Sequence, residues 1–336
     1  VMSKEAIYQM LNKEDLSFDT ARIVMDEIMS GEATNAQISA FVTALRMKGE
    51  SIEEITGCAS SMRGNGVKLN HLNDVLEIVG TGGDEAFTFN ISTVSSIVIS
   101  AAGVPVAKHG NRSVSSKCGA ADVLEALGVK IDIPVEKSEK ILDEIGLCFM
   151  FAPIYHSSMR YAAPVRKEIG VRTIFNILGP LSSPAAANYQ LLGVYKEDLI
   201  EPLAKVLANL GVKKAMVVNG NDGLDEITLS GTTKVCEYKN GEFRNYVLDP
   251  KEYGFEYCKN EDLVGGDPEK NAEIARSIFR GEKGPKRDVI VLNSAICLYL
   301  ADAVMTISDG VNLATEIIDS GKAMEQLEKF VKLSNE

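Results

Sequence analysis

From about residue 75 onwards, short apolar segments alternate with segments of helical periodicity. The apolar segments are VLEIVG, VPVAKHG, CFMFAP, QLLGVY and KAMVVNG. Helical patterns such as EDLIEPLAKVLANLG lie between them. Strands that alternate with helices indicate a largely parallel sheet covered on both faces. We therefore expect an α/β fold with a central, mostly parallel sheet flanked by helices.

The first 65 or so residues, in contrast, contain only helical patterns. Thr34 with Gln37, and Ser51 with Glu54, have the spacing of capping boxes at the start of two such patterns. Both patterns carry one apolar stripe at helical spacing, so each helix is expected to bury one face. The sequence therefore predicts a separate helical part before the α/β part.

Two features near the C-terminus depart from the strand–helix alternation. In CEYKNGEFRNYV, Asn240-Gly241 separates two alternating segments and predicts a β-hairpin. Asp267-Pro268 is expected to begin a helix, and the sequence from Ser294 to the end is helical in pattern.

Composition excludes several classes of protein. The 336 residues include 35 Lys and Arg but 47 Asp and Glu, a net charge of −12, whereas a nucleic-acid-binding protein normally has a basic face. The six cysteines show no paired spacing, so we expect reduced thiols rather than disulfides or a zinc ribbon. The first residues lack the pattern of a signal peptide, and no apolar run is long enough to cross a bilayer. These features predict a cytoplasmic protein with neither nucleic acid nor membrane as a partner.

The glycine-rich segment IVGTGGDEAFTFNIST joins the first predicted strand to the next helix. Backbone N–H groups in such a turn, together with a helix N-terminus, form an anion site at the carboxyl end of a parallel strand. Two familiar phosphate loops are excluded. Glu85 occupies the position of the third glycine of a dinucleotide-binding GxGxxG, and the chain has no Gly-Lys-Ser/Thr.

The segment KHGNRSVSSKCG forms a second polar turn between a predicted strand and a predicted helix. Lys108, Arg112 and Lys117 supply positive charge, and Ser115 or Ser116 could cap the following helix. A solvated basic turn is the alternative interpretation. Two such turns in succession, however, favour a ligand with several anionic groups.

Two further segments carry charge. Asp225 and Glu226 follow a predicted strand that ends at Val218, and their carboxylates suit the Mg²⁺ that accompanies a polyphosphate, although loop acids are often only solvated. Adjacent residues of a regular strand point to opposite faces, so the two acids must lie in an irregular loop to serve one ligand, or else contact different ions or waters. The turn-forming sequence at residues 221–223 favours the loop. Arg160, Arg166, Lys167 and Arg172 lie on or beside a helix, where the alternative is surface arginines whose stems pack on it.

No set of nucleophile, base and acid is present in the sequence. His71, His109 and His156 have no motif-linked serine or cysteine partner, so no general base is assigned. Covalent catalysis is therefore not expected.

These four segments, in this order and spacing, resemble the anthranilate phosphoribosyltransferase family along essentially the whole chain. The family pattern GTGGD-x-x-x-TFNIST corresponds to residues 80–84 and 88–93, and KHGN-R-x-x-SS corresponds to 108–116. The family's Asp-Glu pair corresponds to Asp225-Glu226, and NILGPLSSPA follows its substrate arginine, here Arg166. One departure is Cys118-Gly119-Ala120, where many members have Ser-Gly-Ser, so a hydroxyl contact to phosphate is absent at Ala120 while the backbone amide remains.

The resemblance implies the second step of tryptophan biosynthesis from chorismate. The phosphoribosyl group of 5-phosphoribosyl 1-diphosphate (PRPP) is transferred to the amine of anthranilate, and pyrophosphate leaves. Catalysis would stabilise the charge of the leaving group, with Mg²⁺ (one or two ions) as cofactor. Because the amine of anthranilate is neutral at pH 7, correct placement can suffice without a strong base.

The resemblance also implies which residues bind each ligand. Those expected to bind PRPP are Gly80, Gly82, Gly83, Asp84, Thr88, Asn90, Ile91, Ser92, Thr93, Lys108, Asn111, Arg112, Ser113, Val114, Ser115, Ser116 and Ala120. Those expected to bind anthranilate are Gly80, His109, Asn111 and Arg166. The expected metal ligands are Ser92, Asp225 and Glu226.

In the family a small helical domain joins a large α/β domain, and the ligands bind between them. Here the helical domain would comprise residues 1–70, joined by a returning segment at about 167–187, and the α/β domain residues 71–336. A homodimer through the helical domain is expected, whereas association with anthranilate synthase is not readable from the sequence.

Two alternative functions share this architecture. One is a pyrimidine-nucleoside phosphorylase, whose glycine-rich and lysine-serine motifs differ. The other is a non-catalytic relative that binds nucleic acid, which should be basic and lack the Asp-Glu pair.

Overall fold

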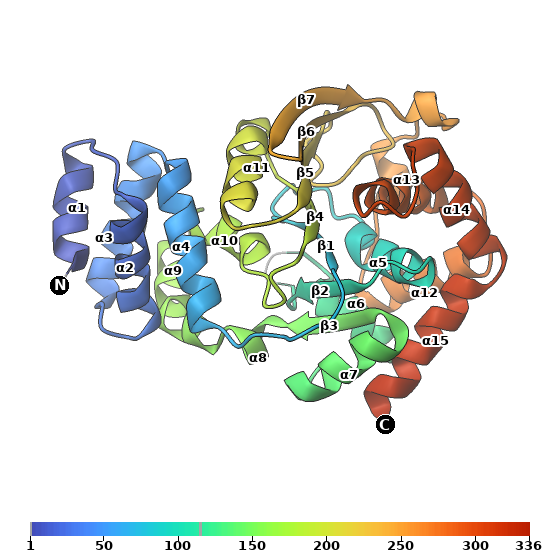
Figure 1. The fold of residues 1–336 in the computed structure, drawn as a ribbon, viewed down its shortest axis with the longest axis horizontal. Coiled ribbons are helices and arrows are strands. Elements are labelled where there is room, and N and C mark those ends of the chain that lie inside the picture. The colour runs from blue at the N-terminus through green and yellow to red at the C-terminus, as the bar shows by residue number, and fades with distance from the viewer. Residues whose placement is uncertain (1, 114–115) are drawn as a thin grey trace.

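The computed structural model describes residues 2–113 and 116–336 (Figure 1). Its α-helices are α1 (Met2–Leu11), α2 (Phe18–Met29), α3 (Asn35–Lys48), α4 (Ile52–Asn65), α5 (Ile91–Ala101), α6 (Ala120–Ala126), α7 (Val135–Ile145), α8 (Ala152–Tyr155), α9 (Ala163–Ile169), α10 (Phe175–Leu181), α11 (Ile200–Asn209), α12 (Pro268–Phe279), α13 (Pro285–Leu300), α14 (Ile307–Asp319) and α15 (Lys322–Asn335). Its strands are β1 (Leu76–Gly80), β2 (Val106–Gly110), β3 (Leu147–Phe151), β4 (Tyr189–Gly193), β5 (Lys214–Gly220), β6 (Thr233–Lys239) and β7 (Glu242–Leu248).

The strands form one mixed sheet in the order β3-β2-β1-β4-β5-β6-β7. Neighbours from β3 to β5 are parallel, and β6 and β7 add two antiparallel pairings at one edge. The prediction of a mostly parallel sheet is therefore confirmed. The hairpin is confirmed as well, and Asn240 (φ 53°) and Gly241 (φ 80°) have the positive φ angles that a tight two-residue turn requires.

Helices cover both faces of the sheet, as predicted (Figure 1). Alternate residues of the central strands enter two different cores: Met216 and Val218 of β5 pack with α5 and α13, whereas Val217 packs with α11. This alternation follows from the two-residue period of a strand and explains why these segments are apolar throughout.

The four N-terminal helices pack together, and both predicted capping boxes are present. The carboxylate of Glu54 has a further role. It accepts N–H hydrogen bonds from Ser51 (2.7 Å) and Leu16 (2.7 Å) and pairs with Lys48 Nζ at 2.7 Å. One fully buried side chain thus ties the start of α4 to the end of α3 and to the α1–α2 connection.

Helices α9 and α10 return to the N-terminal helices and pack on α3 and α4 respectively. Ala162, Val165 and Phe175 belong to the same hydrophobic core as α2 and α4. Helix α11 contacts both α4 and β5, so this core continues from the helices to the sheet. The domain boundaries at residues 70 and 71, with a returning segment at about 167–187, stay a prediction.

The strand order reverses direction between β1 and β4. From β1 the chain proceeds outward through β2 and β3, and then returns to the other side of β1 with β4. Such a reversal is where an open parallel sheet binds its ligand, outside the carboxyl ends of the strands. The glycine-rich segment, the 111–119 turn and the loop after β5 all follow strands at this edge.

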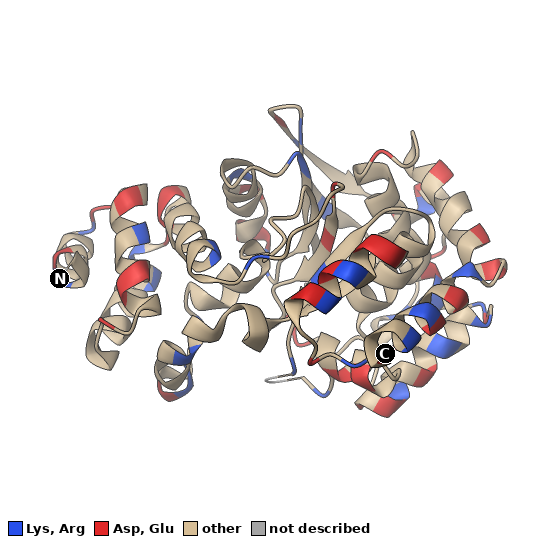
Figure 2. Cartoon of the chain, turned by 60° about the horizontal axis from the view of Figure 1, so that its bottom comes forward, with Lys and Arg blue, Asp and Glu red and all other residues tan. Residues whose placement is uncertain are grey.

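None of the helices in the two described ranges combines the length and apolar character needed to cross a membrane. Acidic and basic side chains are interspersed along the helices of the α/β part (Figure 2).

Candidate active site

The glycine-rich segment after β1 has an unusual backbone conformation. Gly82 (φ 71°), Gly83 (φ 76°), Glu85 (φ 57°) and Phe87 (φ 53°) all have left-handed φ angles. Non-glycine residues in this region cost about 1 kcal/mol or more each, and such strain is concentrated at ligand sites. The segment therefore depends on contacts with its surroundings.

Two aspartates supply those contacts. Asp225 Oδ2 accepts a hydrogen bond from the Gly82 N–H at 2.7 Å, and the Asp225 N–H donates to Asp84 Oδ2 at 3.1 Å. Asp84 Oδ1 also accepts from the Ala86 N–H at 3.0 Å. The glycine-rich segment and the loop after β5 are thus bound to each other at the sheet edge.

The loop after β5 lies directly against the ends of β1 and β4. A Cβ atom on Gly80, or on Gly193 at the end of β4, would overlap atoms of Asp225. Both strands must therefore end in glycine for the acidic loop to reach the point where the strand order reverses.

Helix α5 begins immediately after the glycine-rich segment. Asn90 occupies its N-cap position but makes no side-chain capping bond. Its side chain instead donates to the Cys118 carbonyl at 3.0 Å and accepts from Asn271 Nδ2 at 2.9 Å. The Asn90 side chain therefore does not cap the first N–H groups of α5, as suits an anion site.

Asp225 and Glu226 are both buried, and both point toward this segment. Ser92 Oγ donates to Glu226 Oε1 at 2.8 Å, while Asp225 bonds the Gly82 amide. Adjacent residues of a regular strand would point to opposite faces. The irregular loop was predicted for this reason and is confirmed: Asp222 accepts from the Leu224 N–H (3.1 Å) and Thr228 Oγ1 (2.8 Å) and so fixes a turn.

Burial sets the electrostatics of the pair. It raises the pKa of Glu226 to about 7, against an ordinary value of 4.5. It also raises the pKa of Asp225 well above its ordinary value, with repulsion from Glu226 and Asp84 in the same direction. A bound cation would offset the repulsion between the two carboxylates, so cation binding is favourable beside them and the serine hydroxyl.

The donor set fits Mg²⁺ that arrives with a phosphate-bearing ligand. Within residues 2–113 and 116–336, no three His, Cys, Asp or Glu side chains converge into a metal cage. Mg²⁺ usually takes only one or two carboxylates beside substrate phosphates and water. Ser92, Asp225 and Glu226 are such a set.

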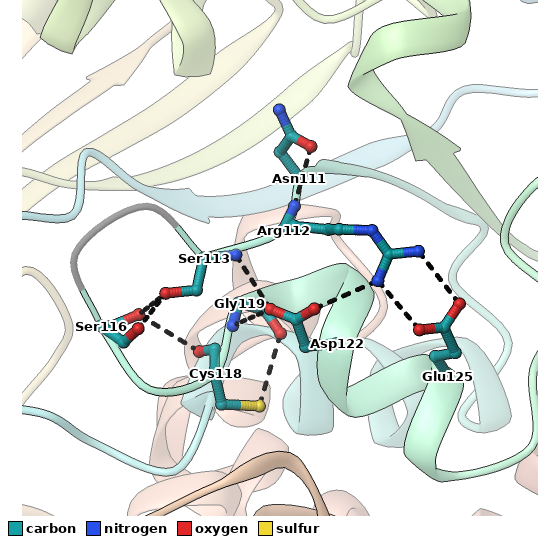
Figure 3. A network of polar contacts seen from close by, with 8 residues as sticks. All are labelled: Asn111, Arg112, Ser113, Ser116, Cys118, Gly119, Asp122 and Glu125. Atoms are coloured by element: carbon teal, nitrogen blue, oxygen red, sulfur yellow. Dashed lines mark hydrogen bonds and ion pairs between the residues drawn. The ribbon is translucent and has the colours of Figure 1, made fainter. Parts of the chain in front are cut away.

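The second polar turn is built around Asp122 (Figure 3). Its carboxylate accepts the N–H groups of Ser113 and Gly119, both at 2.9 Å, and contacts Arg112 at 3.3 Å. Burial alone would raise the pKa of Asp122, but these donors hold it below its ordinary value. Arg112 in turn forms a two-point pair with Glu125, at 2.9 and 3.1 Å.

The structure corrects the expectation that Ser116 caps the following helix. Gly119 is the N-cap of α6, so Ser116 does not cap this helix; its hydroxyl lies 3.0 Å from Ser113 Oγ instead. A Cβ atom at Gly119 would overlap the backbone of residues 111–113, so the N-cap position has no room for a side chain, and Asp122 accepts the Gly119 N–H instead. Val114 and Ser115 lie outside the described residues.

His109 and His156 form a buried pair beside the end of β2. Their ring centres are 5.1 Å apart, and His156 Nε2 lies 2.9 Å from the Ser182 carbonyl. Burial lowers the pKa of both rings, that of His109 to about 3, with His156 and Lys108 in the same direction. Both imidazoles are therefore neutral near pH 7, and the absence of a general base stays a prediction.

Arg166 lies on α9. Its side chain is exposed, and its guanidinium carbon is 5.6 Å from the centre of the Phe175 ring. In the described part of the chain it makes no hydrogen bond or ion pair with His109 or Asn111. Its predicted role toward anthranilate stays a prediction.

Sequence reasoning missed three residues of the site and misjudged a fourth. Glu77, Gly193 and Asn293 were not singled out, although an acid within VLEIVG and a glycine at the end of QLLGV are visible signals. The side chain of Asn293, on α13, hydrogen-bonds the backbone of Ile227, the residue after the acid pair. It accepts from the Ile227 N–H at 3.3 Å and donates to the Ile227 carbonyl at 3.0 Å. Arg172, grouped with the other arginines, donates to the Gly83 carbonyl and stacks 3.8 Å from the Tyr195 ring centre.

Comparison with known proteins agrees with this architecture. The helical bundle domain of the glycosyl transferase family matches residues 4–66, and the a/b domain of the same family matches residues 72–324. An anthranilate phosphoribosyltransferase of Ruminiclostridium cellulolyticum is 63% identical over 99% of this chain and 98% of its own.

Solved structures agree as well. The anthranilate phosphoribosyltransferase of Thermus thermophilus is 40% identical, with a TM-score of 0.94 over 98% of this chain and 99% of its own. That of Saccharomyces cerevisiae, in complex with PRPP and Mg, is 28% identical, with a TM-score of 0.91 over 99% of this chain and 98% of its own. The yeast protein is also known in complex with 4-fluoroanthranilate.

The fold and the site define a glycosyl transferase, with an anion-binding edge suited to a phosphorylated sugar. Within that class, the chain belongs to the anthranilate phosphoribosyltransferase family. It is an enzyme of tryptophan biosynthesis that transfers the phosphoribosyl group of PRPP to anthranilate. Full-length identity at this level also decides against the phosphorylase and the non-catalytic alternative.

Gly83→Val is expected to abolish PRPP binding while the protein remains folded. Gly83 has a φ of 76°, and a Cβ atom there would overlap the Arg172 guanidinium, so the segment must change its path. The loss of one or two amide contacts to phosphate would by itself weaken binding on the order of a hundredfold, and a changed path of the whole segment removes the remaining contacts. Calorimetry with PRPP and Mg²⁺ measures it.

Gly211→Val is the matched control. Gly211 also has a left-handed φ, of 96°, but lies in the turn before β5, at the opposite edge of the sheet. It should lower stability and leave PRPP affinity unchanged. Normal PRPP binding by the Gly83 variant would remove the glycine-rich segment from the phosphate site.

The double variant Asp225→Asn/Glu226→Gln is expected to be inactive but more stable than the unchanged protein in metal-free buffer at pH 8. The folded protein binds a proton at Glu226 with a pKa near 7, above the ordinary 4.5, so the unchanged protein loses stability as pH rises between these values. The variant avoids this loss, on the order of 1–3 kcal/mol. At pH 4, where both carboxyls are protonated, the difference should vanish.

Urea unfolding across this pH range measures the difference, and turnover is followed at limiting Mg²⁺. Full turnover by the variant under that limit would leave the two acids as ordinary loop residues.

Proposed function

We propose that the carboxyl ends of β1, β2 and β5 bind PRPP with its diphosphate on the glycine-rich segment and the N-terminus of α5. The proposal includes the residues from Gly80 to Thr93 named above and those from Lys108 to Ala120. The observation that supports it most is the convergence at one edge of three features: the start of α5, which Asn90 does not cap, the strained glycine-rich segment and the buried acid pair.

The metal ligands in this proposal are Ser92, Asp225 and Glu226. Bound there, Mg²⁺ would neutralise negative charge on the diphosphate, which helps pyrophosphate to leave. The yeast relative is known in complex with PRPP and Mg, and a variant of it with Mg bound. The Ser92 hydroxyl is already hydrogen-bonded to Glu226, and Asp225 is bonded to the Gly82 amide of the adjoining segment, so the ligand oxygens lie along the same segment.

Anthranilate is proposed to bind near Gly80, His109 and Asn111, with its carboxylate toward Arg166. A neutral, buried His109 can line an aromatic ring without adding charge. Arginine offers a planar two-donor fork to a carboxylate. Arg166 is exposed on α9, with its guanidinium free of carboxylate partners among the described residues.

The work of the reaction is divided between two groups of residues. Departure of pyrophosphate leaves a sugar with oxocarbenium character, so the backbone amides and Lys108 act mainly on the leaving group. The amine of anthranilate is already neutral and attacks once it is held close to the anomeric carbon. The low pKa values of the two buried histidines agree with a site that places its nucleophile rather than deprotonates it.

The activity is tested by mixing pure protein with anthranilate, PRPP and Mg²⁺ and following the loss of anthranilate fluorescence. We expect loss that requires all three components. A parallel assay of pyrimidine-nucleoside phosphorolysis should show none. Phosphorolysis without fluorescence loss would overturn the proposed site.

Arg166→Ala is expected to raise the KM for anthranilate by about tenfold or more, because a two-point hydrogen bond to a carboxylate is lost. The KM for PRPP should change less than about twofold if the arginine contacts only anthranilate. Lys167→Ala, at the next position of α9, is the control and should change neither constant. Equal effects of the two variants would exclude Arg166 from the site.

We further propose a cytoplasmic homodimer that associates through the helical domain. Large apolar side chains are exposed on α1 and α3, which pack on each other: Tyr8 is 72% exposed, Leu11 70% and Met47 85%. Such side chains commonly mark an association surface. Light scattering should give about twice 36.3 kDa, and Leu11→Glu/Met47→Glu should give one chain. A monomeric unchanged protein would contradict this.

A further inference from the structure

Glu77 is a buried carboxylate in the middle of an apolar strand. It lies in β1 between Leu76 and Ile78, which both enter the hydrophobic core around α5, and its own side chain is 1% exposed. Burying an acid in this way is costly unless specific partners compensate it. Its partners therefore indicate its role.

Both partners of Glu77 belong to the segment that begins the second polar turn. Glu77 Oε2 accepts a hydrogen bond from the His109 N–H at 2.8 Å, and Oε1 lies 3.8 Å from Lys108 Nζ. Among the described residues, Oε1 has no hydrogen-bond partner.

The carboxylate also stands where the sheet pairing ends. β1 and β2 are in register at a single pair, Leu76 with Val106, whereas β1 and β4 share five pairs. The His109 N–H, which a continuing ladder would use, is bonded to the Glu77 side chain instead. Glu77 thus fixes the end of β2 from which residues 108–119 depart.

The Lys108 ammonium group is fixed in place, but not all of its hydrogen-bond donors are used by the described residues. Its side chain is buried and donates one hydrogen bond, to the His109 carbonyl at 3.2 Å. An ammonium group has three donors. At 3.8 Å, Glu77 supplies a compensating charge without taking up a donor, so donors remain for an anionic ligand.

Burial raises the pKa of the Glu77 carboxyl to about 7, while the positive charge of Lys108 opposes the rise.

We propose that Glu77 is a positioning residue for PRPP, which holds the Lys108 ammonium and the His109 backbone in place so that Lys108 can bind a phosphate oxygen. The proposal rests on the proposed role of Lys108 toward PRPP. Its distinguishing feature is that the charge of Glu77, and not only its shape, is needed.

Glu77→Gln tests the charge. The amide retains an oxygen that can accept from the His109 N–H but removes the negative charge beside Lys108. We expect the Kd of PRPP with Mg²⁺, measured by calorimetry, to rise about tenfold, as for a weakened charged hydrogen bond. The KM for PRPP should rise in parallel, while that for anthranilate changes less than about twofold.

Glu237→Gln is the matched control. Glu237 is another buried carboxylate of the same sheet, bonded by Tyr246 (2.7 Å) and Tyr299 (3.3 Å) on β7 and α13. It should lower stability without changing either substrate constant. If Glu77→Gln behaves in the same way, Glu77 is only structural and the proposal is overturned.

Two further variants separate the possible failures. Lys108→Met should weaken PRPP binding at least as much as Glu77→Gln; if it does not, the proposed role of Lys108 fails with the inference. If Lys108→Met weakens binding but Glu77→Gln does not, only the inference fails. Should Glu77→Gln not fold, Glu77→Asp keeps the charge but shortens its reach, and unchanged PRPP affinity in that variant would also overturn the proposal.

Discussion

The close approach of the loop after β5 to the ends of β1 and β4 is the constraint on which the site depends. Gly80 and Gly193 leave no Cβ atom in the way, so Asp225 can reach across and bind the amide of Gly82. That bond is one of several contacts that hold the glycine-rich segment, in which Gly82, Gly83, Glu85 and Phe87 have left-handed φ angles. The same approach buries Glu226 beside Ser92 at the N-terminus of α5. The proposed phosphate loop and the proposed metal ligands are therefore parts of one structure.

This arrangement has an electrostatic cost, which the proposed complex of PRPP with Mg²⁺ would relieve. Asp84, Asp225 and Glu226 are grouped at the edge, and burial together with mutual repulsion raises the pKa of the last two. The lysine available at the end of β2, Lys108, is already compensated by Glu77. A site so rich in carboxylates favours a phosphate ligand that brings its own cation. The negative charge of these carboxylates thus influences which ligand the site favours.

The helical part is connected to the phosphate segment by a short series of contacts. Arg46 of α3 donates to the carbonyl of Arg172, and the Arg172 guanidinium donates to the carbonyl of Gly83. Arg172 is also stacked on Tyr195, just after β4. Because α11 packs on both α4 and β5, the same two parts share a hydrophobic core as well. The glycine-rich segment is therefore supported both by the helical part and by the sheet.

The sequence by itself determined the strand–helix alternation, the parallel sheet, the hairpin at Asn240-Gly241 and both capping boxes, because each depends on local periodicity or on residues within a few positions. Motif order also indicated the family, and turn-forming residues predicted that Asp225 and Glu226 lie in an irregular loop. Only the tertiary structure showed that Asp122 rather than a serine satisfies the start of α6, and that Glu77 binds the backbone of His109. These contacts join residues from neighbouring strands and from loops brought together at one edge. Their partners are set by strand order and burial, which no local pattern encodes.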